Sequence, residues 1–441
     1  MTTTNRKAVV AAALITGSVA LTACGGQTQP ADDQQTLTVQ TLPALSEGFR
    51  AVADQLEAEN EGLTVELVTI TDQQKITTNL QVLASDGAPD VGVVPTNTAA
   101  YSSLSAADAL LPLNDVWAAA SLEEAYGADL AAALNPTGTP NVVLANRSLY
   151  SILWYNAAIF DQLGIEVPED HQIASVDDLV EITDALRAGG FDPLAIGGSA
   201  NYQWGWVVDS LLPTAASPGQ LENYLTNWQP SVEVSAQYSD PAFTDTLDRI
   251  QEMYDRGVFQ DGALSQDGEA SLSLFAAERA GMLIGGSYNP GQFANDQGLD
   301  LDLGYLFLPP MTEGELTLPN TYAGNTLVVP RASANPDMAK AFLELLVSPR
   351  FQQEIFAARG ELPATQVSLD VLEESFEPIV IDLINYGEDN GVASGWTSLV
   401  PGSLGQQFVD PKIQAILAGT STVEQVAAEL DAQLQLTRSG S

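Results

Sequence analysis

Nucleophiles and metal ligands are scarce in this chain of 441 residues, which contains one cysteine, Cys24, and one histidine, His171. A single cysteine excludes intrachain disulfides and cysteine-rich metal sites, and a single histidine excludes a zinc site built on a histidine pair. A histidine-dependent triad would need His171, which lies in a polar segment and is expected to be solvent-exposed. No G-x-S-x-G motif marks a nucleophilic serine. We therefore expect neither a metal nor a cofactor, and no enzyme of these classes.

Aromatic residues beside Gly-rich turns are better candidates for ligand contacts. Tyr202, Trp204 and Trp206 follow a Gly-Gly-Ser turn at a predicted strand-to-helix junction. Trp204 and Trp206 are two residues apart near a helix start and point to different sides, so we expect one in a cleft and one in the core, with Trp204 favoured for the cleft. Trp396 lies in a Gly/Ser-rich loop and is expected to face a ligand or solvent. Core packing is the alternative for each tryptophan.

The elements that position such residues alternate between strands and helices. Leu37–Leu42 and Leu63–Ile70 have the period-two pattern of strands, and Val91–Val94 is a short apolar strand suited to a parallel sheet. Helices are predicted from Ser46 and from Thr71 or Asp72. This order predicts parallel strands joined by right-handed crossovers, which bind ligands beyond the carboxyl ends of the strands.

Polar side chains follow these strands at the expected edge. Glu47 comes after the first strand, and Gln73 and Gln74 come after the second. We predict that Glu47 and Gln74 contribute to a binding site there, while solvation of a helix start is the alternative for each.

The composition narrows the functional classes. The chain has 15 Lys plus Arg against 57 Asp plus Glu, a net charge of −42, and 45% hydrophobic residues. Nucleic-acid binding is excluded because it needs clustered cations. The length predicts two or three domains, and the hydrophobic content excludes a disordered acidic chain.

The first 26 residues have the pattern of an export signal. A basic pair, Arg6-Lys7, precedes the apolar run Ala8–Leu21, which is too short to span a membrane. The run ends in Leu21-Thr22-Ala23-Cys24-Gly25-Gly26, which resembles the bacterial lipobox. This resemblance implies that residues 1–23 are a lipoprotein signal peptide, that Cys24 is lipidated and that residues 24–35 form a flexible tether to the outer face of the cytoplasmic membrane.

The remaining chain continues the α/β alternation. We predict strands over Ser151–Asn156, Ala280–Gly286 and Leu303–Leu308, and amphipathic helices over Val176–Arg187 and Asn335–Leu346. No short repeat and no second low-complexity tract occurs.

Five segments in order resemble one family. They are Gly87-Ala88-Pro89-Asp90-Val91, Trp154–Ile165, Phe275–Tyr288, Ser333–Leu343 and Gly419–Gln425. Together, behind a lipobox, they resemble the extracellular solute-binding lipoproteins of ABC importers, family 1, of the sugar type related to maltose-binding protein. The resemblance covers Leu37 to Leu436.

The resemblance implies a two-lobed periplasmic-binding-protein-like fold (type II), each lobe a mainly parallel sheet flanked by helices. Lobe one is assigned to residues 36–148 plus 311–347, and lobe two to residues 149–310 plus 348–441. The hinge segments are expected near Leu144–Leu153, Tyr305–Pro310 and Val347–Pro349. Closure of the lobes on a solute would then be the mechanism.

The resemblance also implies particular contact residues. Tyr288 occupies the position where the family usually has a stacking Trp, and Asn97 matches a position just past the third strand that often binds sugar. Asn289 and Asn325 are weaker candidates. No clustered Lys or Arg is expected near these positions, which argues against a phosphorylated solute.

The function implied is capture of a neutral sugar or oligosaccharide for a membrane permease by a monomeric, lipid-anchored protein. A cationic or other small solute is an alternative, because carboxylates with aromatics suit it. A surface-anchored glycoside hydrolase is a further alternative, since 57 acidic residues permit a catalytic pair. An adhesin or structural module is also left open.

Overall fold

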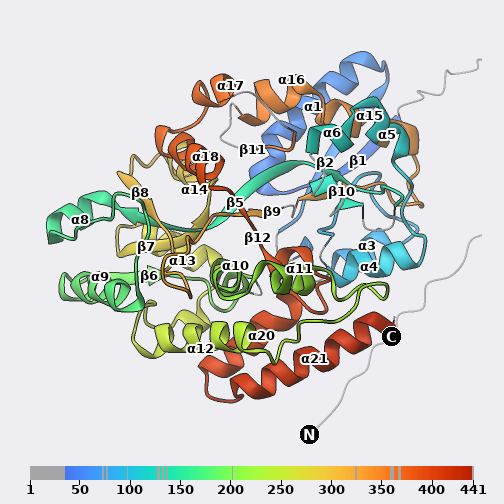
Figure 1. The fold of residues 1–441 in the computed structure, drawn as a ribbon. Coiled ribbons are helices and arrows are strands. Elements are labelled where there is room, and N and C mark those ends of the chain that lie inside the picture. The colour runs from blue at the N-terminus through green and yellow to red at the C-terminus, as the bar shows by residue number, and fades with distance from the viewer. Residues whose placement is uncertain are drawn as a thin grey trace, which may run out of the picture.

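The structure is a computed structural model that describes residues 35–71, 74–75, 78–96, 98–126, 130–131, 134–135, 138–200, 202–322, 325–357, 362–365 and 369–439. These residues form two α/β lobes with separate hydrophobic cores (Figure 1). The α/β class expected from the sequence is confirmed. Within the described ranges no helix has the length and apolarity that a membrane span requires. The predicted signal peptide and Cys24 lie outside the described residues.

Lobe one contains a parallel pair of strands and a small antiparallel sheet. β1 and β2 pair along their whole length, and Val39 of β1 also bridges Val91 in parallel, so the predicted parallel order is confirmed. β10 lies between β3 and β4 and is antiparallel to both. The elements of this lobe are β1 (Gln35–Thr41), α1 (Ser46–Glu59), β2 (Leu63–Thr69), α3 (Asn79–Leu83), β3 (Gly92–Val93), α4 (Ala99–Ala106), α5 (Asn114–Ala119), α6 (Leu122–Tyr126), β4 (Val143–Leu144), β10 (Thr326–Val328), α15 (Pro336–Leu346), α16 (Pro349–Phe351), a π-helix (Gln352–Phe356) and β11 (Leu362–Pro363).

Helix α1 packs through one apolar face because Phe49, Val52 and Leu56 recur at helical spacing and are all buried. The Phe49 ring lies 5.7 Å from the ring of Phe342 on α15 and 6.4 Å from that of Phe356, both edge-on. Segments far apart in sequence therefore close one core.

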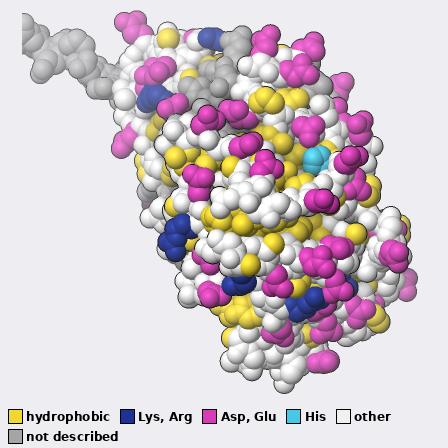
Figure 2. All heavy atoms as spheres, turned by 90° about the vertical axis from the view of Figure 1, so that its left-hand side faces the viewer, with side chains coloured by type: hydrophobic (Ala, Val, Ile, Leu, Met, Phe, Trp, Pro, Cys, Tyr) yellow, Lys and Arg dark blue, Asp and Glu magenta, His cyan; other side chains and the backbone are white. Residues whose placement is uncertain are grey.

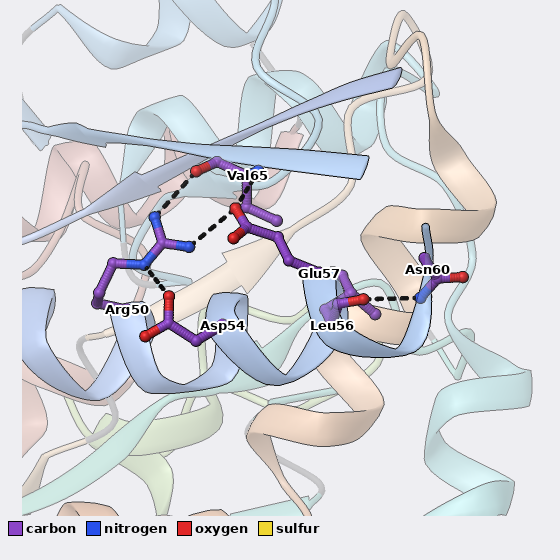
Figure 3. A network of polar contacts seen from close by, with 6 residues as sticks. All are labelled: Arg50, Asp54, Leu56, Glu57, Asn60 and Val65. Carbon is purple, nitrogen blue, oxygen red and sulfur yellow. Dashed lines mark hydrogen bonds and ion pairs between the residues drawn. The ribbon is translucent and has the colours of Figure 1, made fainter. Parts of the chain in front are cut away.

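The opposite face of α1 covers the outer edge of β2 (Figure 3). The Val65 amide donates to Glu57 Oε1 at 2.7 Å, and the Val65 carbonyl accepts from Arg50 Nη1 at 3.1 Å. Arg50 also contacts Glu57 at 3.0 Å and Asp54 at 2.7 Å. Two side chains thus satisfy the polar groups that an edge strand leaves unpaired.

We expect Glu57→Ala to lower the free energy of unfolding by about 1–2 kcal/mol, because the buried Val65 amide loses its acceptor. Asp54→Asn is the matched control: that ion pair is more exposed and should change stability by less than about 0.5 kcal/mol. Urea unfolding of both variants measures the difference. Equal losses would contradict the role assigned to Glu57.

Lobe two is built on one mixed sheet of order β12-β9-β5-β7-β6, with β8 and β11 also pairing with β5. The mainly parallel sheet expected for this lobe is wrong, because β5 is antiparallel to all four of its partner strands. β6 and β7 are parallel, and all seven residues of β7 are buried. The elements are β5 (Asn146–Asn156), α8 (Ala157–Leu163), α9 (Val176–Ala188), β6 (Asp192–Ala195), α10 (Gln203–Ala215), α11 (Pro218–Thr226), α12 (Pro241–Asp255), α13 (Gly268–Ala276), β7 (Ala280–Gly286), α14 (Asn289–Gly291), β8 (Leu303–Leu306), β9 (Asn320–Tyr322), α17 (Leu369–Glu373), α18 (Pro378–Asn390), β12 (Ala393–Ser394), α19 (Trp396–Leu399), α20 (Gln406–Leu417) and α21 (Val423–Ser439).

Three chain segments cross between the lobes, and they lie side by side. β5 is central: Ser148 pairs with Tyr322 of β9 on one side, and Arg147 pairs with Leu362 of β11 on the other. The first core ends at Ala145 before β5, which agrees with the hinge expected near Leu144–Leu153.

The other two hinge positions and the lobe boundaries differ from the prediction. Residues 311–322 belong with lobe two because β9 pairs with β5, and the chain returns only before β10. Phe351, Phe356 and Ala364 pack in the first core, so the last crossing follows Ala364 and is not at Val347–Pro349. Both predicted crossings were therefore placed too early in the sequence.

Candidate functional site

Tyr202 and Tyr288 follow two adjacent parallel strands of lobe two at their carboxyl ends. Tyr202 comes after β6 and Tyr288 comes directly after β7. β5 enters from lobe one at the same edge, because Tyr150 pairs with Gly286, the last residue of β7. Both tyrosines are half-buried. This edge therefore presents two aromatic side chains next to the crossing segments.

Four aromatic residues at this edge belong to or pack against the same hydrophobic cluster, and we call them the aromatic row: Tyr202, Trp206, Tyr150 and Tyr288. The Trp206 ring lies 5.1 Å from Tyr202 and 5.6 Å from Tyr150. The Tyr288 ring covers Gly286, where a Cβ would come within 2.5 Å of Tyr288 Cε1. Gly286 leaves room for that ring because it has no side chain. Tyr150 and Trp206 are buried, so the half-buried Tyr202 and Tyr288 are the accessible members of the aromatic row.

Trp204 and Trp396 lie in the core of lobe two, contrary to the expectation of ligand-facing rings. Both side chains have no exposed surface. Trp204 Nε1 donates to the Gly198 carbonyl at 2.9 Å, and its ring meets Phe259 edge-on at 5.0 Å. The Trp396 ring packs against Phe243 at 5.0 Å, under the start of α19. Neither tryptophan joins the aromatic row.

Two polar side chains that were predicted to contact the solute form hydrogen bonds to nearby backbone amides. Asn289 is buried, and its Oδ1 accepts from the Gly286 amide at 2.8 Å, which fixes the turn after β7. Gln74 Oε1 accepts from the Thr71 amide at 2.9 Å while Thr71 Oγ1 accepts from the Gln74 amide at 3.1 Å. This reciprocal pair caps the helical turn that follows β2.

The lobe-one candidates are spread over the carboxyl ends of its strands. Glu47 is exposed in the first turn of α1, after β1. Asn97 lies outside the described residues. Asn325 lies at a crossing segment, where its Nδ2 donates to Asn146 Oδ1 at 3.0 Å. Asn325 therefore contacts the start of β5.

A cation, Lys75, lies beside Asn325. Lys75 is buried, and its ammonium donates to Asn325 Oδ1 at 3.2 Å. Lys75 follows Gln74 in the turn after β2, so it connects lobe one to the crossing strand. One lysine is not a cluster of Lys or Arg, so the expectation that no such cluster lies near the candidate positions stays a prediction.

Sequence reasoning missed Tyr150 and Asp209. Tyr150 O–H donates to Asp209 Oδ2 at 2.9 Å, and Asp209 has no exposed surface. Burial raises the pKa of the Asp209 carboxyl to about 6, although hydrogen bonds from Thr397, Tyr150 and Ser398 act in the opposite direction. An isolated Asp inside the apolar run Trp206–Leu212 was the signal that could have revealed it.

A separate surface pocket of about 330 Å³ lies on lobe two and contains none of the predicted contact residues. His171 forms part of it and is half-buried, with a ring stacked on Tyr305 at 4.0 Å, rather than fully exposed. Burial and the Asp382 carboxylate raise the pKa of Tyr305. The lining is Glu169, Asp170, His171, Tyr305, Leu316, Asp382, Asn385, Tyr386, Asp389 and Asn390.

Acidic side chains are spread widely over the surface. Figure 2 shows one face of the molecule, on which Asp and Glu outnumber Lys and Arg. Among the described residues, no group of three or more His, Cys, Asp or Glu is arranged to hold a metal ion.

Comparison with known proteins identifies relatives along most of the chain. The sequence model of the family described as bacterial extracellular solute-binding protein matches residues 42–353. An uncharacterized ABC transporter extracellular-binding protein of Pyrococcus horikoshii is 22% identical over 404 residues, covering 89% of this chain and 83% of that protein. The diacetylchitobiose binding protein DasA of Streptomyces coelicolor is 27% identical over 312 residues, covering 66% of this chain and 63% of that protein.

Solved structures share the fold. A chitin oligosaccharide binding protein superposes with a TM-score of 0.76 at 19% identity, covering 92% of this chain and 100% of that one. RafE in complex with raffinose gives a TM-score of 0.66 at 18% identity, covering 91% and 100%. The two-lobed arrangement expected from the sequence is thus confirmed.

Proposed function

Since the chain belongs to the family of bacterial extracellular solute-binding proteins, we propose that it captures a neutral sugar or oligosaccharide between its lobes and delivers it to the permease of an ABC importer. The observation that carries the proposal is the aromatic row. Tyr202 and Tyr288 offer ring faces at the carboxyl ends of parallel strands, beside the segments that join the lobes. Ring faces suit the apolar C–H faces of a sugar, and sheets of this kind bind ligands at that edge.

The kind of solute follows from the side chains available. Glu47 in lobe one is a candidate for the sugar hydroxyls, and we keep Asn97 and Asn325 as candidates beside it. The relatives support the choice, since DasA is a diacetylchitobiose binding protein and RafE was solved with raffinose. Closure on the solute would shift an open–closed equilibrium without chemical conversion, so the protein acts as a receptor and not as an enzyme.

The test is a binding screen on the mature protein. Calorimetry and thermal shift are run with diacetylchitobiose, raffinose, xylo-oligosaccharides and one cationic solute, spermidine. Saturable binding of a sugar without new products supports the proposal. Preference for spermidine would favour a cationic solute, and hydrolysis products would indicate a glycosidase.

Tyr288→Ala is expected to weaken binding of the selected sugar about 30-fold, because loss of an anchoring ring costs about 2 kcal/mol. Tyr288→Phe keeps the ring and should bind within about threefold of the native protein. Titration calorimetry measures both, and circular dichroism checks folding. Unchanged affinity in Tyr288→Ala would place the site elsewhere.

A substitution at Gly286 also tests the role of the Tyr288 ring. Gly286→Ala leaves Tyr288 in the chain but puts a methyl group within 2.5 Å of its Cε1 and 3.0 Å of the Leu149 carbonyl. Binding should weaken at least tenfold. Gly219→Ala is the control, since nothing lies within 4 Å of its added Cβ.

We also propose that the protein is a lipoprotein anchored through Cys24 to the outer face of the cytoplasmic membrane and that it acts as a monomer. The support is the segment Leu21–Gly26, whose cysteine is the only one in the chain. Cys24→Ala is expected to move the protein from the membrane fraction to the medium or periplasm, because acyl transfer supplies about 0.8 kcal/mol per buried CH₂. Fractionation measures this, and retention in the membrane would contradict the anchor.

A further inference from the structure

Two carboxylates are buried in the core of lobe two without a cation. Asp209 on α10 and Asp410 on α20 both have no exposed surface. Neither forms an ion pair among the described residues. Asp410 Oδ1 accepts from the Gly205 amide at 3.1 Å, whereas its Oδ2 has no hydrogen-bond partner. Burying a carboxylate without a counterion costs free energy of folding.

Asp209 joins three elements. Its Oδ1 accepts from the Thr397 amide at 2.8 Å, and its Oδ2 accepts from Thr397 Oγ1 at 2.6 Å and from Tyr150 O–H at 2.9 Å. The Tyr150 hydroxyl also lies 2.8 Å from Ser398 Oγ. α10, α19 and β5 are therefore tied together at one carboxylate.

The hydrogen bonds of Tyr150 act on the crossing strand β5. It lies in β5 just after the crossing, and the pairing with β7 shifts register between Tyr150 and Ile152. The intervening Ser151 has φ +66°, a left-handed conformation that is strained for serine, and its Oγ donates to the Trp206 carbonyl at 2.9 Å. The crossing strand is thus bonded to the helix that carries Trp206.

We propose that Asp209 is a positioning residue for solute binding: its carboxylate fixes Tyr150, and through Tyr150 it holds the crossing strand and the aromatic row in the arrangement that binds solute. The inference rests on the proposed function. It adds that solute affinity depends on the charge of Asp209. An ionised carboxylate accepts all three hydrogen bonds. A proton on Oδ2 places a donor where the carboxylate now accepts from Tyr150 and Thr397 Oγ1, and a proton on Oδ1 places one where it accepts from the Thr397 amide.

The groups that face Asp209 determine how it titrates. Tyr150 faces it from β5, and Asp410 approaches from α20, where the Asp209 charge further raises an Asp410 pKa that burial has already raised. α19 contributes the hydroxyls of Thr397 and Ser398 and the Thr397 amide, none of which titrates in the neutral range. α12 packs on α10 through apolar residues such as Leu247 and Ile250. With the Asp209 pKa at about 6, its charge changes mostly between about pH 5 and pH 7.

The experiment measures affinity against pH for the sugar that binds most tightly in the screen. The native protein should bind about fivefold to tenfold more weakly at pH 5 than at pH 7.5. Asp209→Asn should bind weakly at both and show no dependence in this range. Tyr150→Phe keeps Asp209 but loses the hydroxyl, and it should also lose the dependence.

Asp410→Asn is the matched control, because Asp410 is buried nearby but does not contact Tyr150. It should keep the pH-dependent affinity. A merely structural role for Asp209 predicts the opposite sign, since protonation of a group with a raised pKa stabilises the fold. A native affinity profile that matches that of Asp209→Asn would overturn the proposal.

A readout without solute separates this inference from the proposed function. The protein is labelled with 5-fluorotryptophan, and the Trp206 resonance is assigned with Trp206→Phe. That resonance should titrate near pH 6 in the native protein and not in Asp209→Asn. A resonance that does not move would overturn the positioning role, whereas failure of every sugar to bind would contradict the proposed function alone.

Discussion

Trp204→Ala is expected to lower the free energy of unfolding by about 3–5 kcal/mol, because the change leaves a large cavity in the core of lobe two. The ring has no exposed surface, meets Phe259 edge-on, and its Nε1 bonds the Gly198 carbonyl at 2.9 Å. Urea unfolding followed by circular dichroism measures the loss.

The control for this prediction is Trp228→Ala. Trp228 is half-buried, and its Nε1 bonds the Leu225 carbonyl three residues away. Its loss should cost roughly half as much, since less apolar surface is removed from the core. If Trp204→Ala unfolds like the native protein but binds sugar poorly, the ring lies in the binding site and the core assignment is wrong.

The second large effect is the pH dependence of stability from Asp209. Its folded pKa of about 6 lies above the ordinary value of 3.8. Between these values the folded state holds a proton that the unfolded state has released. The stabilisation is therefore fully present below pH 3.8 and is lost as the pH rises through about 6. A shift of this size corresponds to about 3 kcal/mol.

The measurement compares the native protein with Asp209→Asn at each pH from 4 to 7.5. Relative to the variant, the native protein should lose about 2.5 kcal/mol of stability over this range, since pH 4 already lies above the unfolded value. The same measurement on Asp410→Asn gives the contribution of the neighbouring Asp410 carboxyl to the pH dependence. A constant difference between native protein and Asp209→Asn at all pH values would contradict the raised pKa.

The sequence predicted the elements well where the local signals were strong. The helix Val176–Ala188 begins after Ser175, whose Oγ accepts from the Asp178 amide as expected of a cap. β7 was predicted residue for residue, because a continuous apolar run ending in glycines suits a buried strand. Asn335 stands at the cap position of α15, but its side chain instead donates to the Thr36 carbonyl.

The tryptophans show why the site was harder to predict. Trp204 and Trp206, two residues apart, were predicted to face different environments. That prediction holds only for a helix with one exposed side. α10 is buried on almost every side, so Trp204 and Trp206 both lie inside, and only their neighbours distinguish them. Trp396 looked accessible because glycines surround it, yet its ring packs against Tyr238 and Phe243 and has no exposed surface.

The crossing segments were hard to predict for a different reason. β9 has three residues and β11 has two, so neither carries a periodic signal. Their pairing with β5 joins residues more than 170 positions apart, as in Ser148 with Tyr322. Such contacts depend on the whole fold and leave no local pattern.

The interleaved order of the two cores has a consequence for how the chain is made and exported. The first core includes Leu327 to Ala364, and the second includes Trp396 to Leu434. During synthesis neither lobe can complete its core until most of the chain has emerged from the ribosome. A chain that cannot finish a lobe early stays unfolded longer, which suits threading through a secretion channel before folding outside the cell.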